Sequence, residues 1–217
     1  MNRWIRRKCN SHGYGVQSPG DFYFVQHVLR ETSPYYAYAE LEQAGKVFSR
    51  ALPHYPSRVN RLLFRLSNHV HPHTIIEVGT GSGLSAYTLS LGCTGAQCIT
   101  IGPCECPAQL AHSPRIDYRS GDEMATFDTI LSTLGKVDLL HIGHTAHYRE
   151  VLEKALPYVG DHTLIIIGGI RDDKAKHAWW QALMDSHTGI AYDVKEVGLL
   201  FFNTSRHKNT YWVKLKD

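Results

Sequence analysis

The stretch Ile75-Ile76-Glu77-Val78-Gly79-Thr80-Gly81-Ser82-Gly83-Leu84-Ser85 decides the fold. It begins as a mostly apolar strand, passes through three alternate glycines and continues into a run with helical periodicity. In a parallel sheet such a turn lies at the carboxyl edge, where ligands bind. Gly79 and Gly81 would let a ligand approach the backbone, and Ser82 or Ser85 is a candidate cap for a helix whose first N–H groups face that ligand.

Short apolar runs alternate with helical stretches on the C-terminal side of Thr74, which indicates βαβ units and a parallel sheet. We expect strands at Thr74–Val78, Gln97–Ile101, Ile116–Arg119, Val137–Ile142 and Leu164–Gly168, and helices at Leu84–Leu91, Ala146–Leu156 and Asp173–Met184. Three further strands, Ile190–Val194, Gly198–Asn203 and Thr210–Leu215, have no long helix between them, so part of their pairing must be antiparallel. The predicted fold class is a Rossmann-like α/β fold with a mostly parallel sheet, an antiparallel C-terminal hairpin and helices on both faces.

The N-terminal part has a different pattern, since residues Phe22 to Leu66 carry helical periodicity interrupted at Ser33-Pro34 and Pro53–Ser57. It predicts two to three helices that cover the sheet. At 217 residues the chain suits one domain, with a helical region over residues 1–70 and a sheet region over residues 71–217.

Composition narrows the functional classes. Apolar residues make up 43% of the chain, yet no run of them is long enough to span a bilayer, and no apolar segment follows the basic N-terminus as in a signal peptide. The chain has five cysteines, and Cys104 and Cys106 form a C-x-C pair. A zinc site would need a second pair of ligands, which the sequence lacks, so free thiols in a reducing compartment are the better interpretation. We therefore expect a soluble, cytoplasmic protein. The net charge of +3 and the short basic arm Arg3, Arg6, Arg7 and Lys8 do not indicate nucleic-acid binding, and no membrane partner is expected.

The glycine spacing distinguishes two classes of nucleotide site. A dinucleotide fingerprint would need glycine where Leu84 stands, whereas the chain has Glu-x-Gly-x-Gly-x-Gly. This pattern resembles the first motif of class I S-adenosylmethionine (SAM) methyltransferases, in which the leading acid organises the turn and the glycines admit the cofactor. The resemblance implies SAM as cofactor and the cofactor-binding residues Glu77, Gly79, Thr80, Gly81, Ser82 and Gly83, with Asp122 of Ser120-Gly121-Asp122 near the adenine.

Further segments are similar to proteins related to small-molecule O-methyltransferases. They are His12-Gly13, Val16-Gln17-Ser18-Pro19, Tyr35-Tyr36-Ala37-Tyr38 and Arg61–Leu66. The chain departs from that family at four acidic positions. Gly102 stands where an acid after the second strand would bind the ribose hydroxyls, and Glu105 is a candidate substitute. Loss of that acid would weaken SAM binding about ten- to a hundredfold or more.

The other three departures concern a metal site. Gly143, Gly168 and Gly169 stand where metal-dependent relatives place carboxylates. Since glycine offers no oxygen ligand from a side chain, no catalytic magnesium or calcium site is expected. Asp172 and Asp173 are more simply caps of the following helix.

The pattern singles out no catalytic residue. His141, His144 and His147 cluster near the expected ligand edge, but we expect them to be satisfied or solvated rather than a zinc site or a general base. Trp179, Trp180, Tyr35, Tyr36 and Tyr38 could wall an acceptor pocket or belong to the core.

Two hypotheses follow. The first is a metal-independent SAM methyltransferase that aligns a small-molecule acceptor in line with the methyl group. The second is a noncatalytic relative that keeps the fold with weak or no SAM binding. An NAD-dependent oxidoreductase is disfavoured by Leu84 and Gly102. A homodimer is left open.

Overall fold

The computed structural model describes residues 2–48, 55–104, 108 and 113–216. Its centre is an eight-stranded sheet with the order β3-β2-β1-β4-β5-β7-β6-β8. The strands are β1 (Thr74–Val78), β2 (Gln97–Ile101), β3 (Ile116–Arg119), β4 (Leu139–Ile142), β5 (Leu164–Gly168), β6 (Ile190–Asp193), β7 (Val197–Phe201) and β8 (Asn209–Trp212).

Strands β1 to β5 are all parallel, and β7 runs antiparallel between β5 and β6. The predicted antiparallel C-terminal hairpin is therefore confirmed as β6–β7, and β8 lies parallel to β6 at the edge. One predicted strand was too long at its start, because the Val137 N–H donates to the Tyr158 carbonyl rather than to a neighbouring strand.

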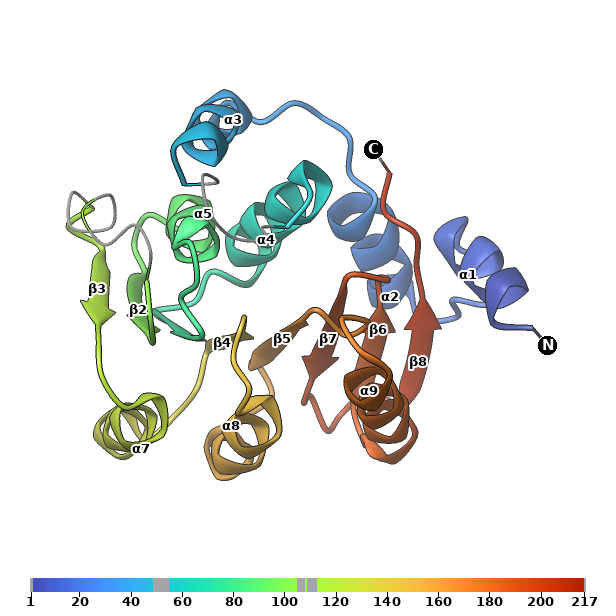
Figure 1. Cartoon of the computed structure of the whole chain (residues 1–217). Helices are drawn as coiled ribbons and strands as arrows, with labels where there is room; N and C mark the ends of the chain where they lie inside the picture. Colours follow the sequence, from blue (N-terminus) through green and yellow to red (C-terminus); the bar gives the residue numbers. More distant parts are fainter. Residues whose placement is uncertain (1, 49–54, 105–107, 109–112, 217) are drawn as a thin grey trace.

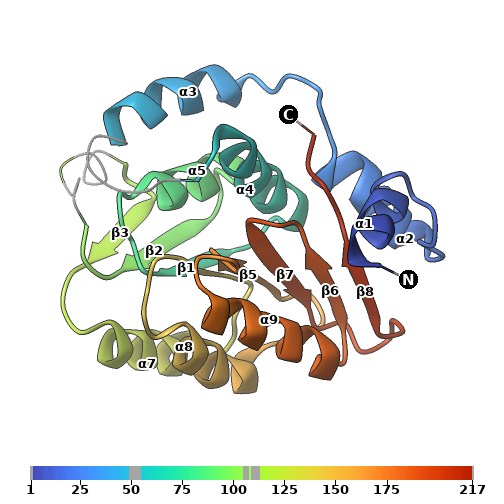
Figure 2. The same cartoon turned by 45° about the vertical axis from the view of Figure 1, so that its right-hand side comes forward.

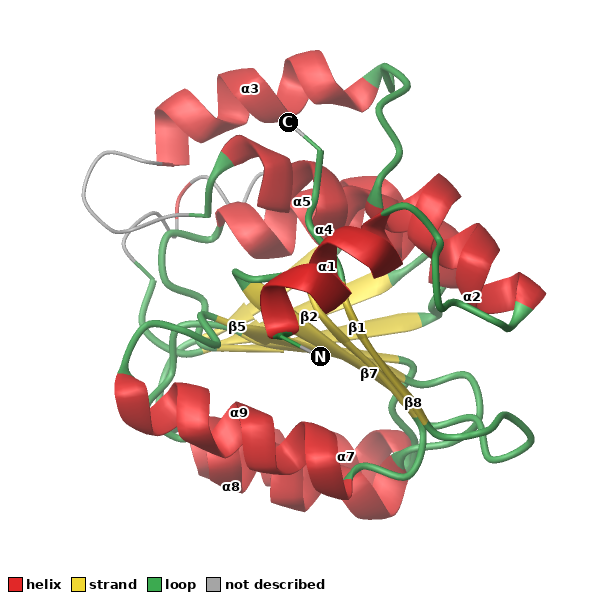
Figure 3. Ribbon diagram, turned by 90° about the vertical axis from the view of Figure 1, so that its right-hand side faces the viewer, coloured by secondary structure: helices red, strands yellow, loops and turns green. Residues whose placement is uncertain are grey.

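Helices cover both faces of the sheet, as predicted (Figures 1 and 3). On one side lie α7 (Glu123–Leu134), α8 (Tyr148–Ala155), which continues into η2 (Leu156–Tyr158), and α9 (Lys174–Ser186). On the other side lie α4 (Ser57–Val70) and α5 (Leu84–Gly92), with α3 (Ala37–Phe48) outside them (Figure 2). Alternate residues of the central strands point to opposite faces, so Ile75 and Ile76 enter two separate hydrophobic clusters.

The described part of the N-terminal region holds the predicted three helices, since α2 (Pro19–Phe24) with its continuation η1 (Val25–Leu29) precedes α3 and α4. One further helix, α1 (Arg3–Ser11), was not predicted. Helix α1 has no broad apolar stripe, and it lies beside β8, where Arg7 donates to the Asp193 and Val213 carbonyls. The basic arm is thus partly structural rather than wholly solvated. In the described part of the chain, no helix has the length and apolarity to cross a bilayer.

Candidate functional site

The glycine-rich turn lies where β1 ends and α5 begins, at the carboxyl edge of the parallel strands. Gly79, Gly81 and Gly83 have φ angles of 92°, 57° and 85°, in the region that favours glycine. The turn is fastened to the end of β2, because the Gly79 N–H donates to the Ile101 carbonyl at 2.8 Å and the Gly81 N–H to the Pro103 carbonyl at 3.1 Å. Its glycines are therefore required by the backbone shape itself.

Glu77 anchors a buried chain of polar side chains beneath the turn. Its two carboxylate oxygens lie 2.7 Å from His141 Nδ1 and 2.6 Å from Thr100 Oγ1, which donates to the carboxylate. Thr100 in turn pairs with Thr80 of the turn at 2.8 Å. Glu77, Thr100 and His141 have no exposed surface. The leading acid thus acts through Thr100 and Thr80 on the shape of the turn and does not itself face a ligand.

Tyr55 extends this chain from the N-terminal region. Its hydroxyl lies 3.2 Å from His141 Nε2, and its ring stacks on His144 at 5.4 Å between centroids. Burial raises the pKa of the Tyr55 phenol well above its usual range, with the Glu77 charge adding to the effect, so the hydroxyl stays protonated. Nothing in the local sequence marks Tyr55, since it reaches His141 from 86 residues away.

A cavity of about 550 Å³ opens beside Gly81. We name it the Gly81 cavity, and its lining is contributed by the turn and by the segments that follow β2, β3 and β4: Gly81, Pro103, Gly121, Asp122, Glu123, Met124, His144, Thr145, Ala146 and His147. Of the predicted cofactor-binding residues it contains Gly81 and Asp122, while Glu77 and Thr80 lie buried below it. Asp122 also caps α7, with Oδ1 2.7 Å from the Ala125 N–H.

Gly79 does not offer the open backbone that its sequence position suggested. The His144 N–H donates to the Gly79 carbonyl at 3.3 Å, and a Cβ added to Gly79 would lie 2.7 Å from the His144 carbonyl carbon. The loop after β4 therefore covers Gly79. At Gly81 the nearest atom to an added Cβ is in the His144 ring, at 3.4 Å. Room for a ligand begins at Gly81.

Ser82 and Gly83 contribute to the start of α5. Gly83 occupies the N-cap position in a left-handed conformation, and the Ser82 hydroxyl lies 3.4 Å from the Leu84 N–H. Ser85 lies inside the helix, so neither of the two serines proposed from the sequence is the N-cap residue of α5, and the Ser82 hydroxyl makes only this long contact with the Leu84 N–H.

The three histidines are separated rather than gathered on one point. His141 is buried and hydrogen-bonded to Glu77, His144 lies exposed at the Gly81 cavity and His147 precedes α8. Among the described residues no group of three metal-ligating side chains comes together. Desolvation, followed by repulsion from His141, lowers the pKa of the His144 imidazole, so this ring is neutral at pH 7.

The three glycines at the metal-ligand positions are packed against protein atoms. A Cβ would lie 1.7 Å from the Tyr55 hydroxyl at Gly168, 2.7 Å from the Gly79 carbonyl oxygen at Gly143, and 1.9 Å from the Asp172 carboxylate at Gly169. The obstacle is backbone at Gly143 and a side chain at Gly168 and Gly169, so carboxylates at these positions would require the neighbouring atoms to move. Asp173 caps α9 through the Lys176 N–H, as predicted, whereas Asp172 is not the N-cap residue.

A smaller cavity of about 260 Å³ adjoins the other side of His144. We name it the Tyr55 cavity, and it is lined by Tyr55, Pro56, His144, Gly169, Arg171, Asp172, Lys195 and Glu196. The aromatic residues that the sequence offered for an acceptor pocket or for the core do not line the Tyr55 cavity. Trp180 is fully buried core, Trp179 packs on Tyr148, and Tyr35 packs on Tyr38. Tyr38 lines a neighbouring cavity of about 430 Å³ between α3 and α4, which Tyr55 and Leu84 also line.

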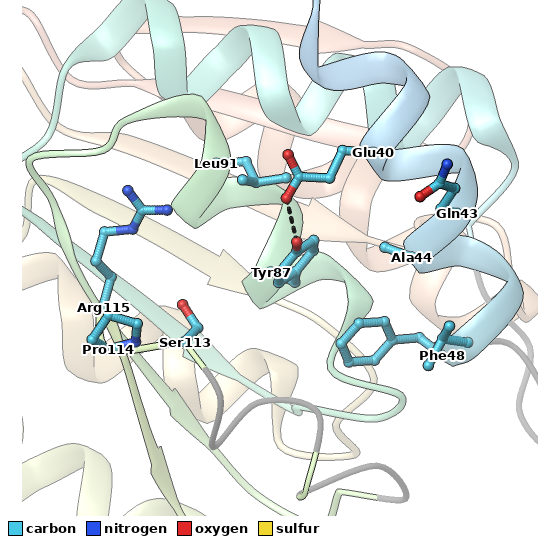
Figure 4. Close-up of a pocket in the computed structure, with 10 residues that line it drawn as sticks. Glu40, Gln43, Ala44, Phe48, Tyr87, Leu91, Ser113, Pro114 and Arg115 are labelled. Atoms are coloured by element: carbon cyan, nitrogen blue, oxygen red, sulfur yellow. Dashed lines mark hydrogen bonds between the residues drawn. The ribbon is translucent and has the colours of Figure 1, made fainter.

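A cavity of about 470 Å³ between α3 and α5 lies away from the turn (Figure 4). Ser113, Pro114 and Arg115 line it where the chain enters β3, at the amino edge of the parallel strands. The Tyr87 hydroxyl donates to Glu40 across it, at 2.5 Å. This cavity is therefore separate from the ligand edge of the sheet.

Glu123 is a residue of the Gly81 cavity that the sequence did not point to. A Cβ added to Gly102 would lie 2.4 Å from its Oε1 atom, and the Thr145 hydroxyl donates to its Oε2 atom at 2.5 Å. Glu105, the residue considered as a substitute for the acid missing at Gly102, lies outside the described residues, as does Cys106.

The strand order, the antiparallel β7 and the glycine-rich turn after β1 together define a Rossmann-like methyltransferase fold. A methyltransferase from Geobacter sulfurreducens is similar in structure, with a TM-score of 0.59 and 17% identity over 83% of this chain and 94% of the other. An O-methyltransferase from Bacillus cereus in complex with S-adenosylhomocysteine (SAH) has a TM-score of 0.57 and 17% identity, covering 86% and 99% of the two chains. The O-methyltransferase TomG from Streptomyces achromogenes, in complex with SAM, has a TM-score of 0.57 and 16% identity over 93% and 99%. No protein-family model and no curated sequence matches the chain.

Proposed function

We propose that this chain is a metal-independent, SAM-dependent methyltransferase acting on a small-molecule acceptor. The observation that carries the proposal is the Gly81 cavity, which lies at the carboxyl edge of the sheet beside the glycine-rich turn and holds Asp122 in its wall. The likeness of the chain in fold to O-methyltransferases with bound SAM or SAH supports the choice of ligand. SAM supplies an activated methyl group, so the protein's task is to align an acceptor with it.

The residues present fit an adenosyl ligand in the Gly81 cavity. Gly81 allows close approach to the backbone, and Asp122 presents a carboxylate beside it. Glu77, Thr80, Gly79, Ser82 and Gly83 would act indirectly, since they hold the turn and the start of α5 in shape.

We place the acceptor in the Tyr55 cavity, because His144 lines both this cavity and the Gly81 cavity. The lowered pKa of His144 leaves a neutral imidazole, which could accept a proton from an acceptor hydroxyl. Tyr55 also lines the Tyr55 cavity, and its hydroxyl lies against Gly168, one of the three positions where metal-dependent relatives have carboxylates. Metal independence follows in this proposal from the absence of carboxylates at Gly143, Gly168 and Gly169.

Calorimetry with SAM and SAH tests cofactor binding, with a dissociation constant in the micromolar range expected. Formation of SAH from SAM in the presence of pooled small hydroxyl compounds then tests transfer, and we expect the rate to be unchanged by EDTA. The absence of heat at millimolar SAH would contradict the proposal. Loss of activity in EDTA would overturn metal independence alone.

The alternative is a noncatalytic relative with the same fold, and one observation favours it. The loop after β4 covers Gly79, which narrows the approach to the turn. This alternative predicts no turnover with any acceptor and weak or no binding of SAH. A cytoplasmic location and a homodimer remain predictions from the sequence; the free thiols of Cys9, Cys93 and Cys98 are consistent with the first.

A further inference from the structure

Gly102, the residue after β2, has no side chain, but the carboxylate of Glu123 from α7 lies beside it. Gly102 follows Ile101 with a φ angle of 120°, a conformation that other residues rarely adopt. An added Cβ would meet Oε1 of Glu123 at 2.4 Å and its carboxyl carbon at 3.3 Å. The Glu123 carboxylate therefore occupies the space that a side chain at position 102 would enter.

Glu123 is held in this place by two elements. It is the first residue of α7, directly after the cap Asp122, and its Oε2 atom accepts the Thr145 hydroxyl from the loop after β4. In the described part of the chain no hydrogen bond reaches Oε1, and no lysine, arginine or histidine lies within ion-pair distance of the carboxylate. An oriented carboxylate whose Oε1 atom accepts no hydrogen bond from the described residues thus lines the Gly81 cavity.

We propose that Glu123 binds the ribose hydroxyls of the adenosyl ligand in place of the acid that the chain lacks at Gly102. Carboxylates recognise ribose in nucleotide-binding α/β folds because they accept hydrogen bonds from the sugar hydroxyls. Here the carboxylate reaches the end of β2 from the first residue of α7, which lines the same cavity as Gly81 of the turn. The proposal rests on the proposed function, since it assumes that SAM or SAH occupies the Gly81 cavity.

Asp122 is less suited to this role. Its Oδ1 atom already accepts the Ala125 N–H at 2.7 Å, and it is not among the atoms nearest to an added Cβ at Gly102. Thr145 has a positioning role, because its hydroxyl fixes one oxygen of Glu123 and directs the other.

The experiment measures SAH affinity by calorimetry for the wild-type chain, Glu123→Gln and Glu153→Gln. The control removes one carboxylate from the exposed surface of α8, outside the cavity. We expect Glu123→Gln to bind SAH about 10- to 100-fold more weakly and the control to match the wild type. An SAH analogue without ribose hydroxyls should bind the wild type more weakly by a similar factor, and Glu123→Gln should distinguish the two ligands much less.

The outcomes separate the two proposals. If wild-type protein binds SAH but Glu123→Gln binds it equally well, the role of Glu123 is overturned while the proposed function stands. If wild-type protein binds no SAH at millimolar concentration, the proposed function fails and this inference with it. If Glu123→Gln does not fold, equal binding of SAH and its analogue to the wild type still overturns the inference.

Discussion

At the scale of single residues, Glu77 joins three strands through one buried carboxylate. Its partners come from β2 and β4, and none of the three side chains is exposed. We predict that Glu77→Gln lowers the free energy of unfolding by about 1.5–3 kcal/mol, because glutamine has one acceptor oxygen instead of two and no charge to strengthen the bonds to Thr100 and His141 in this fully buried site. Urea denaturation measures the change. Glu153→Gln, the same replacement on an exposed face, should stay within about 0.5 kcal/mol of wild type. An equal effect of both variants would contradict the structural role of Glu77.

The contact between Tyr55 and Gly168 gives a second prediction. Gly168→Ala should cost about 1–3 kcal/mol, because its Cβ would lie 1.7 Å from the Tyr55 hydroxyl and the buried ring must move. In a Tyr55→Phe background the added cost should be smaller, since the clashing oxygen is gone. Denaturation of the two single variants and the double variant measures this coupling. Strictly additive costs would show that Tyr55 does not fill the place of a side chain at position 168.

The site could be predicted from the sequence only where its residues are close in the chain. The turn from Gly79 to Gly83 and the helix cap Asp173 were marked by local spacing. Tyr55 and Glu123 were not, because each reaches its partner from an element distant in sequence, and no local pattern records such a contact. The closure of Gly79 by the His144 loop was missed for the same reason.

At the scale of the element, the N-terminus of α9 depends on one side chain. The Asp173 Oδ1 atom accepts the Lys176 N–H at 2.7 Å, which satisfies one of the helix's unpaired donors. We predict that Asp173→Ala lowers the free energy of unfolding by about 1 kcal/mol, while Asp173→Asn keeps the cap and changes it little. Thermal denaturation of both variants gives the comparison. Equal losses for Ala and Asn would assign the effect to charge rather than to capping.

Elements with a strong periodic pattern were predicted closely. Strands β1, β2, β3 and β5 have the predicted bounds. The strands β1, β2 and β5 are short, mostly apolar or β-branched runs that end at turn residues, whereas β3 alternates apolar and charged residues. Helix α1 was missed, since six of its nine residues, Arg3, Arg6, Arg7, Lys8, Asn10 and Ser11, are polar and its packing comes from β8. Its stability depends on the far end of the chain.

At the scale of the whole molecule, Asp193 at the end of β6 connects the two ends of the chain. Its carboxylate, only 2% exposed, lies 2.6 Å from the Arg7 guanidinium of α1 and 2.9 Å from that of Arg171, which precedes α9. Arg7 also donates to the Val213 carbonyl just after β8, at 2.8 Å. One ionic cluster therefore holds the edge of the sheet, and removal of the Asp193 charge should weaken the packing of both the N-terminal helix α1 and the C-terminal strand β8.

This cluster makes stability depend on pH. Burial alone would raise the pKa of Asp193, but the hydrogen bond from Arg171 and the charge of Arg7 outweigh it, so the pKa lies below the usual 3.8. A lowered pKa means that the carboxylate stabilises the fold fully above the unfolded-state pKa, and that this contribution is lost as the pH falls through the folded-state value.

We predict that Asp193→Asn costs about 3 kcal/mol at pH 7, because Arg7 and Arg171 lose their partner. The difference from wild type should shrink as the pH is lowered below 3.8, as measured by urea denaturation between pH 7 and pH 3. A difference that stays constant over this range would mean that Asp193 has the same pKa in the folded and the unfolded chain, and the ionic cluster would not be what holds α1 against the sheet.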